Sequence, residues 1–189
     1  MVSEHERHLI ESLQQDDQSA LQTIFLTYHV ALCRIGFKIT GDADTARDMV
    51  HDVYLKLWQS RKNLSIQVSL EFYLKRAVVN TCLNFLERSK KLASFEYSES
   101  DPRTSANLVE QSHHAQELSA KIDQAIAALP PRTRAVFTLI RFEEMSYREV
   151  AESLNISLKA VEKEMMKALN LLRMALKDYL MLFFLLVLS

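Results

Sequence analysis

The sequence predicts an all-α protein, built as two small helical domains joined by an acidic flexible linker. Only two glycines and three prolines occur in 189 residues, and so few helix breakers over so long a chain indicate mostly helix. Apolar residues recur at three- and four-residue steps, which is the period of a buried helical face. The length is sufficient for two small cores but short for one large enzyme domain.

The charge balance excludes attraction to nucleic acid by the net charge of the chain. Lysine and arginine number 23 against 24 acidic residues, for a net charge of -1. Any DNA contact must therefore be local or assisted by a partner. Cys33 and Cys82 lie in apolar helical patterns without CxxC spacing, so we expect buried, reduced thiols in a cytoplasmic protein. Residues 1–7 lack the apolar stretch of a signal peptide.

The first domain, residues 1–92, is expected to contain three helices. The first helix runs from about Ala20 to Lys38, and Asp42 or Asp44 can cap the second. Ser69 can cap a third helix that reaches about Lys91. The expected core faces are Leu21, Ile24, Phe25, Tyr28 and Leu32, then Ala46, Met49, Val50, Val53 and Leu57, then Leu70, Leu74, Ala77, Val78, Thr81 and Phe85.

Residues 93–115 change in character and predict the linker. They hold five serines, the helix breaker Pro102, and four acidic residues against the single base Arg103. The second domain, residues 116–178, begins with an amphipathic helix that ends at Pro130-Pro131, and the second proline suits the first turn of the next helix. The expected inward residues of these two helices are Leu118, Ile122, Ile126 and Leu129, then Ala135, Val136, Leu139 and Ile140.

The segment from Ser146 to Leu176 has the pattern of a helix-turn-helix. Ser146 and Glu149 have the spacing of a capping box, which predicts a helix from about Tyr147. Asn155 tolerates the left-handed conformation of a tight turn, and Ser157 can cap the second helix. Apolar residues would fill the space between the two helices: Val150, Ala151, Leu154, Ile156, Val161 and Met165.

The second helix of such a unit places its first residues in the DNA major groove. The candidate contacts to the bases and phosphates are Ser157, Lys159, Ala160, Glu162, Lys163 and Lys167. The alternative is an ordinary helical hairpin whose lysines form a solvated face. The cap, turn and cap in the correct order favour DNA binding.

A second face of the second helix is not needed for its core. Stepping 100° per residue, the residues opposite the core are Asp48, His51, Asp52, Leu55 and Gln59. An exposed leucine ringed by acids is typical of a docking surface, although single exposed apolar residues are also normal on solvated faces. His51 between two acids lacks a fourth ligand, so we expect no metal here and no cofactor elsewhere.

The third helix also has a second face. Phe72, Val79 and Leu83 lie opposite its core, flanked by Tyr73, Lys75, Arg76 and Asn80. Rings beside cations suit single-stranded nucleic acid, because bases stack on rings and phosphates need positive charge. A helix that is buried on both sides explains the same pattern equally well. Arg88, Lys90 and Lys91 favour the helix C-terminus electrostatically.

Three segments resemble the extracytoplasmic-function (ECF) sigma factors, over about residues 10–178. GDADTARDMVHDVYLKLWQSR is similar to the family's regions 2.1 to 2.2, and SLEFYLKRAVVNTCLNFLERSKK to regions 2.3 and 2.4. LPPRTRAVFTLIRFEEMSYREVAESLNISLKAVEKEMMKAL is similar to region 4. Three departures occur: His51 replaces the usual Gln, Asn155 the usual Gly, and Glu164-Met165-Met166 stand where relatives often have His or Arg.

The resemblance implies a sigma factor, which is not an enzyme but directs core RNA polymerase to promoters. It implies that Asp48, Asp52, Leu55 and their neighbours meet the β′ clamp helices, while the second domain contacts the β flap and its helix 157–167 reads the -35 element. It implies -10 contacts by Phe72, Tyr73, Lys75, Arg76, Asn80 and Arg88. The linker would thread toward the polymerase active centre. A membrane-anchored anti-sigma factor and no small-molecule substrate are also implied.

The tail 179–189 is apolar from Tyr179 to Leu188, too short to cross a bilayer. It can pack on the second domain, contact a partner or rest on a membrane, and its lack of a polar face favours the first two. The rival functions are an autonomous DNA-binding regulator, for which the second domain alone suffices, and a membrane-associated helical adaptor. An enzyme is the least favoured, since no catalytic constellation is present.

Overall fold

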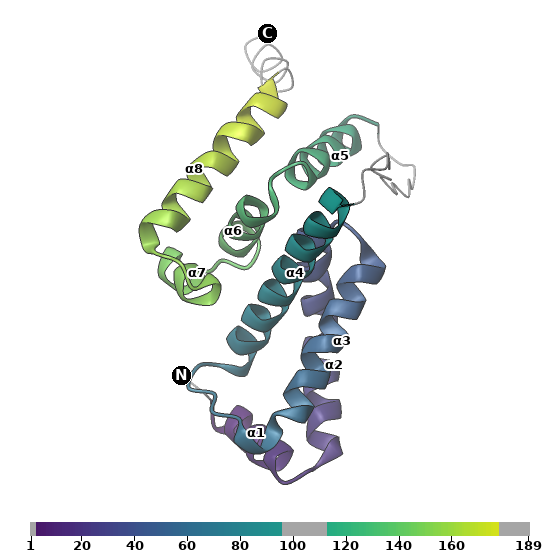
Figure 1. Ribbon diagram of the computed structural model, residues 1–189, viewed down its shortest axis with the longest axis vertical. Helices are drawn as coiled ribbons and strands as arrows, with labels where there is room; N and C mark the ends of the chain where they lie inside the picture. Colours follow the sequence, from purple (N-terminus) through teal and green to yellow (C-terminus); the bar gives the residue numbers. More distant parts are fainter. Residues whose placement is uncertain (1–2, 96–112, 178–189) are drawn as a thin grey trace.

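The computed structural model describes residues 3–95 and 113–177, and within these ranges the chain is helical without strands (Figure 1). The all-α prediction is confirmed. The elements are α1 (Glu4–Gln14), α2 (Gln18–Thr40), α3 (Ala43–Gln59), the short 3-10 helix η1 (Arg61–Asn63), α4 (Leu70–Phe95), α5 (His113–Ala127), α6 (Pro131–Arg141), α7 (Tyr147–Leu154) and α8 (Leu158–Ala175). Residues 96–112 of the predicted linker and the whole apolar tail 179–189 lie outside the described residues.

Helices α2, α3 and α4 form a bundle in which each packs against the other two. Asp42 caps α3, because its Oδ1 accepts a hydrogen bond of 2.7 Å from the Thr45 N–H, and the Ser69 Oγ accepts one of 3.2 Å from the Phe72 N–H at the start of α4. A Cβ at Gly36 in α2 would lie 3.2 Å from the Cβ of Ala46 in α3. The glycine therefore permits the close approach of these two helices.

Helix α1 was not predicted, and it ties the N-terminal segment to α4. Ser3 and Glu6 form a capping box at its start. Glu6 is buried, and its Oε1 also accepts a hydrogen bond of 2.8 Å from the Leu70 N–H in the first turn of α4. Burial alone would raise the pKa of Glu6, but the hydrogen bonds from Ser3 and the α4 N-terminus hold it below its ordinary value.

Three residues assigned to cores are exposed, namely Phe85 in α4 and Leu118 and Ile122 in α5. The buried row of α4 steps by four residues through Leu70, Leu74, Val78 and Cys82, so it turns gradually around the helix and leaves Phe85 aside. Among residues 118–127 of α5, whose side chains the structure describes, Ala125 and Ile126 at the C-terminal end are the buried ones. The core assignments of these three residues were wrong, because helical spacing predicts which side of a helix is apolar but not how far along the helix a partner covers that side.

The two expected domains share one core. Helix α6 packs on α2 and α4, and α7 packs on α4 (Figure 1). The buried side chains of α6, α7 and α8 join the same apolar cluster as those of the first three long helices. We call α5 to α8 the C-terminal unit, and a smaller cluster inside it comprises Ile126, Leu129, Phe137 and Ala168. The boundaries at residues 92 and 116 stay predictions.

Candidate nucleic-acid interface

The helix-turn-helix is formed by α7 and α8, and local hydrogen bonds fix its turn. The Ser146 N–H donates to the Glu149 Oε2 over 2.7 Å, while the Ser146 Oγ accepts from the Glu149 N–H over 3.3 Å. The Ser146 hydroxyl also donates to the Glu149 Oε2 over 2.7 Å, and this bond together with the one from the Ser146 N–H lowers the pKa of Glu149. Asn155 is left-handed at φ 51°, and the Ser157 Oγ accepts a hydrogen bond of 3.2 Å from the Ala160 N–H. The predicted cap, turn and cap are confirmed.

The first turns of α8 present the predicted DNA-contacting residues to solvent. Val161 and Ala168 face the core and are fully buried. Of the predicted contact residues, Ala160 is half-buried, and the exposed ones are Ser157, Lys159, Glu162, Lys163 and Lys167. Because Lys159, Lys163 and Lys167 are spaced by four, they form one basic stripe along the helix. Such a stripe can follow a phosphate backbone, while the Ser157 hydroxyl, whose oxygen caps α8, can still donate its proton to a base edge.

Glu164, which stands where relatives often have a basic residue, is engaged inside the protein. Its Oε2 accepts a hydrogen bond of 2.6 Å from the Thr133 hydroxyl of α6, and Thr133 is fully buried. The bond joins α8 to α6. This role could not be predicted from the sequence, because the partner lies 31 residues away.

The second face of α3 is accessible as a whole. Asp48, His51, Asp52, Leu55 and Gln59 are all exposed, and Leu55 shows 54% of its surface. We call these five residues the α3 face. The His51 ring stacks on that of His29 in α2, with centroids 5.8 Å apart. Burial, followed by the nearby His51, lowers the pKa of His29. Within residues 3–95 and 113–177, no group of three or more His, Cys, Asp or Glu side chains could hold a metal ion.

The second face of α4 is covered by the C-terminal unit. Val79 is fully buried, and the half-buried members are Phe72, Tyr73, Lys75, Asn80 and Leu83, leaving Arg76 and Arg88 exposed. We call these eight residues the α4 face. The Asn80 Nδ2 donates a hydrogen bond of 2.9 Å to the Ser153 carbonyl of α7.

Lys75 lies between two carboxylates, and one of them belongs to the C-terminal unit. Its Nζ is 2.8 Å from Glu143, in the turn after α6, and 2.7 Å from Glu71 on α4 itself. Burial alone would lower the pKa of Lys75, but the hydrogen bonds and charges of Glu143 and Glu71 raise it above its ordinary value. Lys75 is therefore a charged, largely covered side chain in this arrangement.

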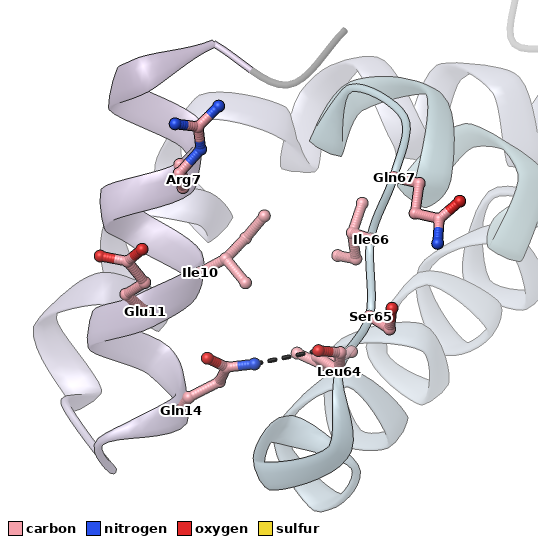
Figure 2. Close-up of a pocket in the computed structure, with 8 residues that line it drawn as sticks. All are labelled: Arg7, Ile10, Glu11, Gln14, Leu64, Ser65, Ile66 and Gln67. Carbon is pink, nitrogen blue, oxygen red and sulfur yellow. Dashed lines mark hydrogen bonds between the residues drawn. The ribbon is translucent and has the colours of Figure 1, made fainter.

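A cavity of about 470 Å³ lies between α1 and the segment 64–67 that follows η1 (Figure 2). Ile10 and Ile66 line it from opposite sides, and Arg7 lies at one end. At the other end the Gln14 Nε2 donates a hydrogen bond of 2.9 Å to the Leu64 carbonyl. The sequence reasoning missed this cavity because it missed α1. The Ser3–Glu6 capping box followed by Leu9, Ile10 and Leu13 at helical spacing was the available signal.

Two family models match the chain, and together they span the greater part of it. Sigma-70 region 2 matches residues 24–92, and Sigma-70, region 4 matches residues 119–172. The first covers the α2–α4 bundle, and the second covers the helices that end in the helix-turn-helix.

Curated relatives carry the same assignment. The RNA polymerase sigma-H factor of Pseudomonas aeruginosa is 23% identical, with 95% of this chain and 98% of that protein covered. The ECF RNA polymerase sigma factor SigW of Bacillus subtilis is 24% identical, with 89% and 95% covered. The ECF RNA polymerase sigma factor SigE of Mycolicibacterium smegmatis is 26% identical over 78% of this chain, which spans 56% of that relative's length.

Solved structures have the same fold. CnrH, solved in complex with the cytosolic domain of CnrY, gives a TM-score of 0.63 at 20% identity, with 91% of this chain and 97% of that chain covered. The sigma factor RpoE of Bartonella quintana, solved with the anti-sigma factor NepR, gives 0.59 at 20% identity, with 82% and 96% covered. With both regions matched in order, the chain belongs to the sigma-70 family as an ECF-type sigma factor, a transcription initiation factor that directs promoter-specific transcription.

Proposed function

We propose that this sigma factor divides its work among three surfaces: the α3 face binds core RNA polymerase, the start of α8 reads the -35 element, and the α4 face binds the -10 element. The observation that carries the proposal is the helix-turn-helix, whose capped turn presents the start of α8 to solvent. Its position after a region 2 bundle is the order that promoter recognition by one polypeptide requires.

The α3 face suits a large protein partner. Leu55 is an exposed apolar residue, and Asp52 and Asp48 lie about one and two helical turns before it on the same side. An apolar contact bordered by charges gives affinity through the leucine and orientation through the acids. The β′ clamp helices of the polymerase are the partner that the family resemblance names, and they should present basic groups to these two aspartates.

The basic stripe of α8 supplies local attraction that the nearly neutral chain lacks. Three lysines contribute phosphate contacts that are independent of sequence, so specificity has to come from Ser157, Ala160 and Glu162 at base edges. Few phosphate contacts give weak and salt-sensitive binding. The free protein is therefore expected to bind duplex DNA poorly and to gain affinity within the polymerase complex.

The relatives support a partner that restrains the protein. CnrH and the Bartonella quintana RpoE were both solved with another protein, which in the second case is named an anti-sigma factor. We propose an anti-sigma factor for this chain as well, anchored in the inner membrane. The protein itself is proposed to act in the cytoplasm, without enzymatic activity, cofactor or small-molecule substrate.

The test is to mix the purified chain with sigma-free core polymerase from the source organism. Native gels report binding, and run-off transcription on sheared genomic DNA reports initiation. Binding with discrete transcripts is expected. Tight duplex binding without any binding to core would favour the autonomous regulator, and liposome binding without a promoter effect would favour the membrane adaptor.

A further inference from the structure

The apolar row of α5 extends beyond the part that neighbouring helices bury. Ile126 is buried in the small cluster of the C-terminal unit, together with Ala168 of α8. Ile122 and Leu118 lie about one and two turns before Ile126 on the same side of α5, because a step of four residues returns almost to the same face. They are nevertheless 37% and 40% exposed. The first half of the described part of α5 therefore presents an apolar row that is only partly covered.

Helix α8 has a matching row, and its burial decreases toward the C-terminal end of the helix. Ala168 is fully buried, whereas Leu172 and Leu176, at steps of four, are half-buried. Leu172 packs against the cluster that holds Ile126, so this row faces the same core as the row of α5. At the edge of the row, Leu169 is 48% exposed.

The partly covered ends of the two rows lie at the same end of the C-terminal unit. Helices α5 and α8 contact each other and run in opposite directions (Figure 1). The first half of α5 therefore corresponds in position to the second half of α8. We call the partly covered residues of both helices the α5–α8 seam: Leu118, Ile122, Leu169, Leu172 and Leu176. The seam is apolar throughout and continues a buried cluster, so it suits an apolar segment better than a charged one.

The chain itself supplies such a segment directly after the seam. Helix α8 ends at Ala175, and after the polar pair Lys177-Asp178 every residue from Tyr179 to Leu188 is apolar. On α8 the seam extends over about 11 Å, from seven residues at the helical rise. Ten residues span about 15 Å as a helix and about 33 Å when extended. The tail is therefore long enough to return along the whole seam from the end of α8.

We propose that the tail 179–189 folds back on the α5–α8 seam of its own chain and completes the apolar core of the C-terminal unit. This docking removes apolar surface of the tail and of the seam from water. Attachment at the end of α8 gives the tail an effective concentration in the millimolar range, which favours its own seam over that of a second copy. The tail carries no charged side chain to face lipid headgroups, so a membrane surface suits it less well. The inference goes beyond the proposed function and does not depend on it.

Paramagnetic relaxation in the full chain tests where the tail lies. A nitroxide is attached to an engineered Ser189→Cys in a Cys33→Ser background, in which the remaining Cys82 is buried. The amide signals of α5 around Ile122 should be broadened beyond detection. The signals around Leu26 on α2 should stay sharp. Leu26 is the matched control position, because it is also apolar and is 70% exposed.

Two matched variants test whether the seam holds the tail. Ile122→Asp and Met174→Asp each place a carboxylate at an exposed apolar position, but Met174 lies about 200° around α8 from both Leu172 and Leu176. Chymotrypsin cleaves after the apolar residues of the tail, and mass spectrometry reports their release. Ile122→Asp should accelerate this release about tenfold, because a buried carboxylate opposes docking and cleavage follows the undocked population. Met174→Asp should match the wild type, and circular dichroism checks that both variants are folded.

Four results would overturn the proposal. Sharp signals around Ile122 would show that the tail does not reach the seam, and equal release from the two variants would show that the seam does not hold it. Broadening that appears only between spin-labelled and isotope-labelled chains in a mixture would assign the tail to a second copy. Sedimentation with phosphatidylglycerol vesicles, without broadening on α5 in their absence, would assign it to a membrane. None of these measurements involves polymerase or DNA, so their outcome is independent of the proposed function.

Discussion

The outer faces of α3 and α4 follow from the same helical spacing, yet the structure treats them in opposite ways. All five residues of the α3 face reach solvent, with Leu55 more than half exposed. On the α4 face Val79 has no exposed surface, and Asn80 is bound to α7. An unused apolar stripe can therefore be a surface for another protein or one side of an internal junction.

The residues that cover the α4 face come from a distant part of the chain. Asn80 meets a residue 73 positions later in the chain, across the predicted linker. The period of one helix carries no information about a cover supplied from so far away. The two explanations that the α4 pattern allowed, nucleic acid binding and burial on both sides, are compatible if the burial is reversible.

The largest expected effect is on the exposed face. Asp52→Lys should weaken core polymerase binding at least about a hundredfold, because like charges would meet where opposite charges are proposed to meet. Fluorescence anisotropy with labelled chain measures the affinity. Asp123→Lys is the control, since it makes the same exposed change on α5. If both variants bind core equally well, the α3 face is not the docking surface.

The next largest expected effect is on DNA binding by the start of α8. Lys163→Glu should leave core binding intact and weaken binding of the holoenzyme to -35 duplex by about ten- to a hundredfold, as expected for the loss of about 1–3 kcal/mol at one contact. Footprinting over a salt series measures it, and the salt dependence should become shallower. An unchanged footprint would favour the interpretation of α7–α8 as an ordinary helical hairpin.

Stability separates the two faces directly. Val79→Ala should lower the free energy of unfolding by about 2 kcal/mol, through lost burial and an incompletely filled cavity. Leu55→Ala should change it by less than about 0.5 kcal/mol, because Leu55 is already exposed. Urea unfolding followed by circular dichroism compares them. Equal losses would mean that the two faces are equally covered in solution.

The smallest effect concerns the anchoring of α1 to α4. The pKa of Glu6 is lowered in the folded state, so its stabilising contribution is present above the ordinary carboxyl pKa and is lost as the pH falls through the lower folded value. Glu6→Gln should cost about 1–2 kcal/mol at pH 7 and progressively less below about pH 4.5. Unfolding titrations from pH 7 to pH 3 test this. A difference that is independent of pH would contradict a charged role for Glu6.

Local signals were the most informative part of the sequence. Ser146 and Glu149 predicted the start of α7, and Asn155 and Ser157 predicted the turn between α7 and α8, because their effects are confined to backbone groups within three residues. The same Ser-x-x-Glu spacing occurs at Ser3 and Glu6, but α1 was not predicted, because the apolar residues Leu9, Ile10 and Leu13 that follow form only a short helical pattern. That helix depends on a distant partner, the Leu70 N–H.

Long-range contacts could not be predicted in this way. From the sequence, Glu164 is interpreted as a replaced DNA contact, but in the structure it accepts a hydrogen bond from Thr133. Phe85 was predicted to be a core residue, but the buried row of α4 does not include it. Both depend on where a second helix lies in space. Of the two cysteines that were expected to be buried, Cys82 is buried because its own helix places it on the covered side, whereas Cys33 is only half-buried.

The crossing of α2 and α3 at Gly36 has a consequence for the evolution of polymerase binding. A methyl group there would press on Ala46 and shift α3 outward by a few tenths of an ångström. The orientation of every side chain on the far side of α3 would change with it. Because the α3 face is the proposed polymerase surface, selection for that fit would also act on Gly36, which is buried and lies on the opposite side of α3.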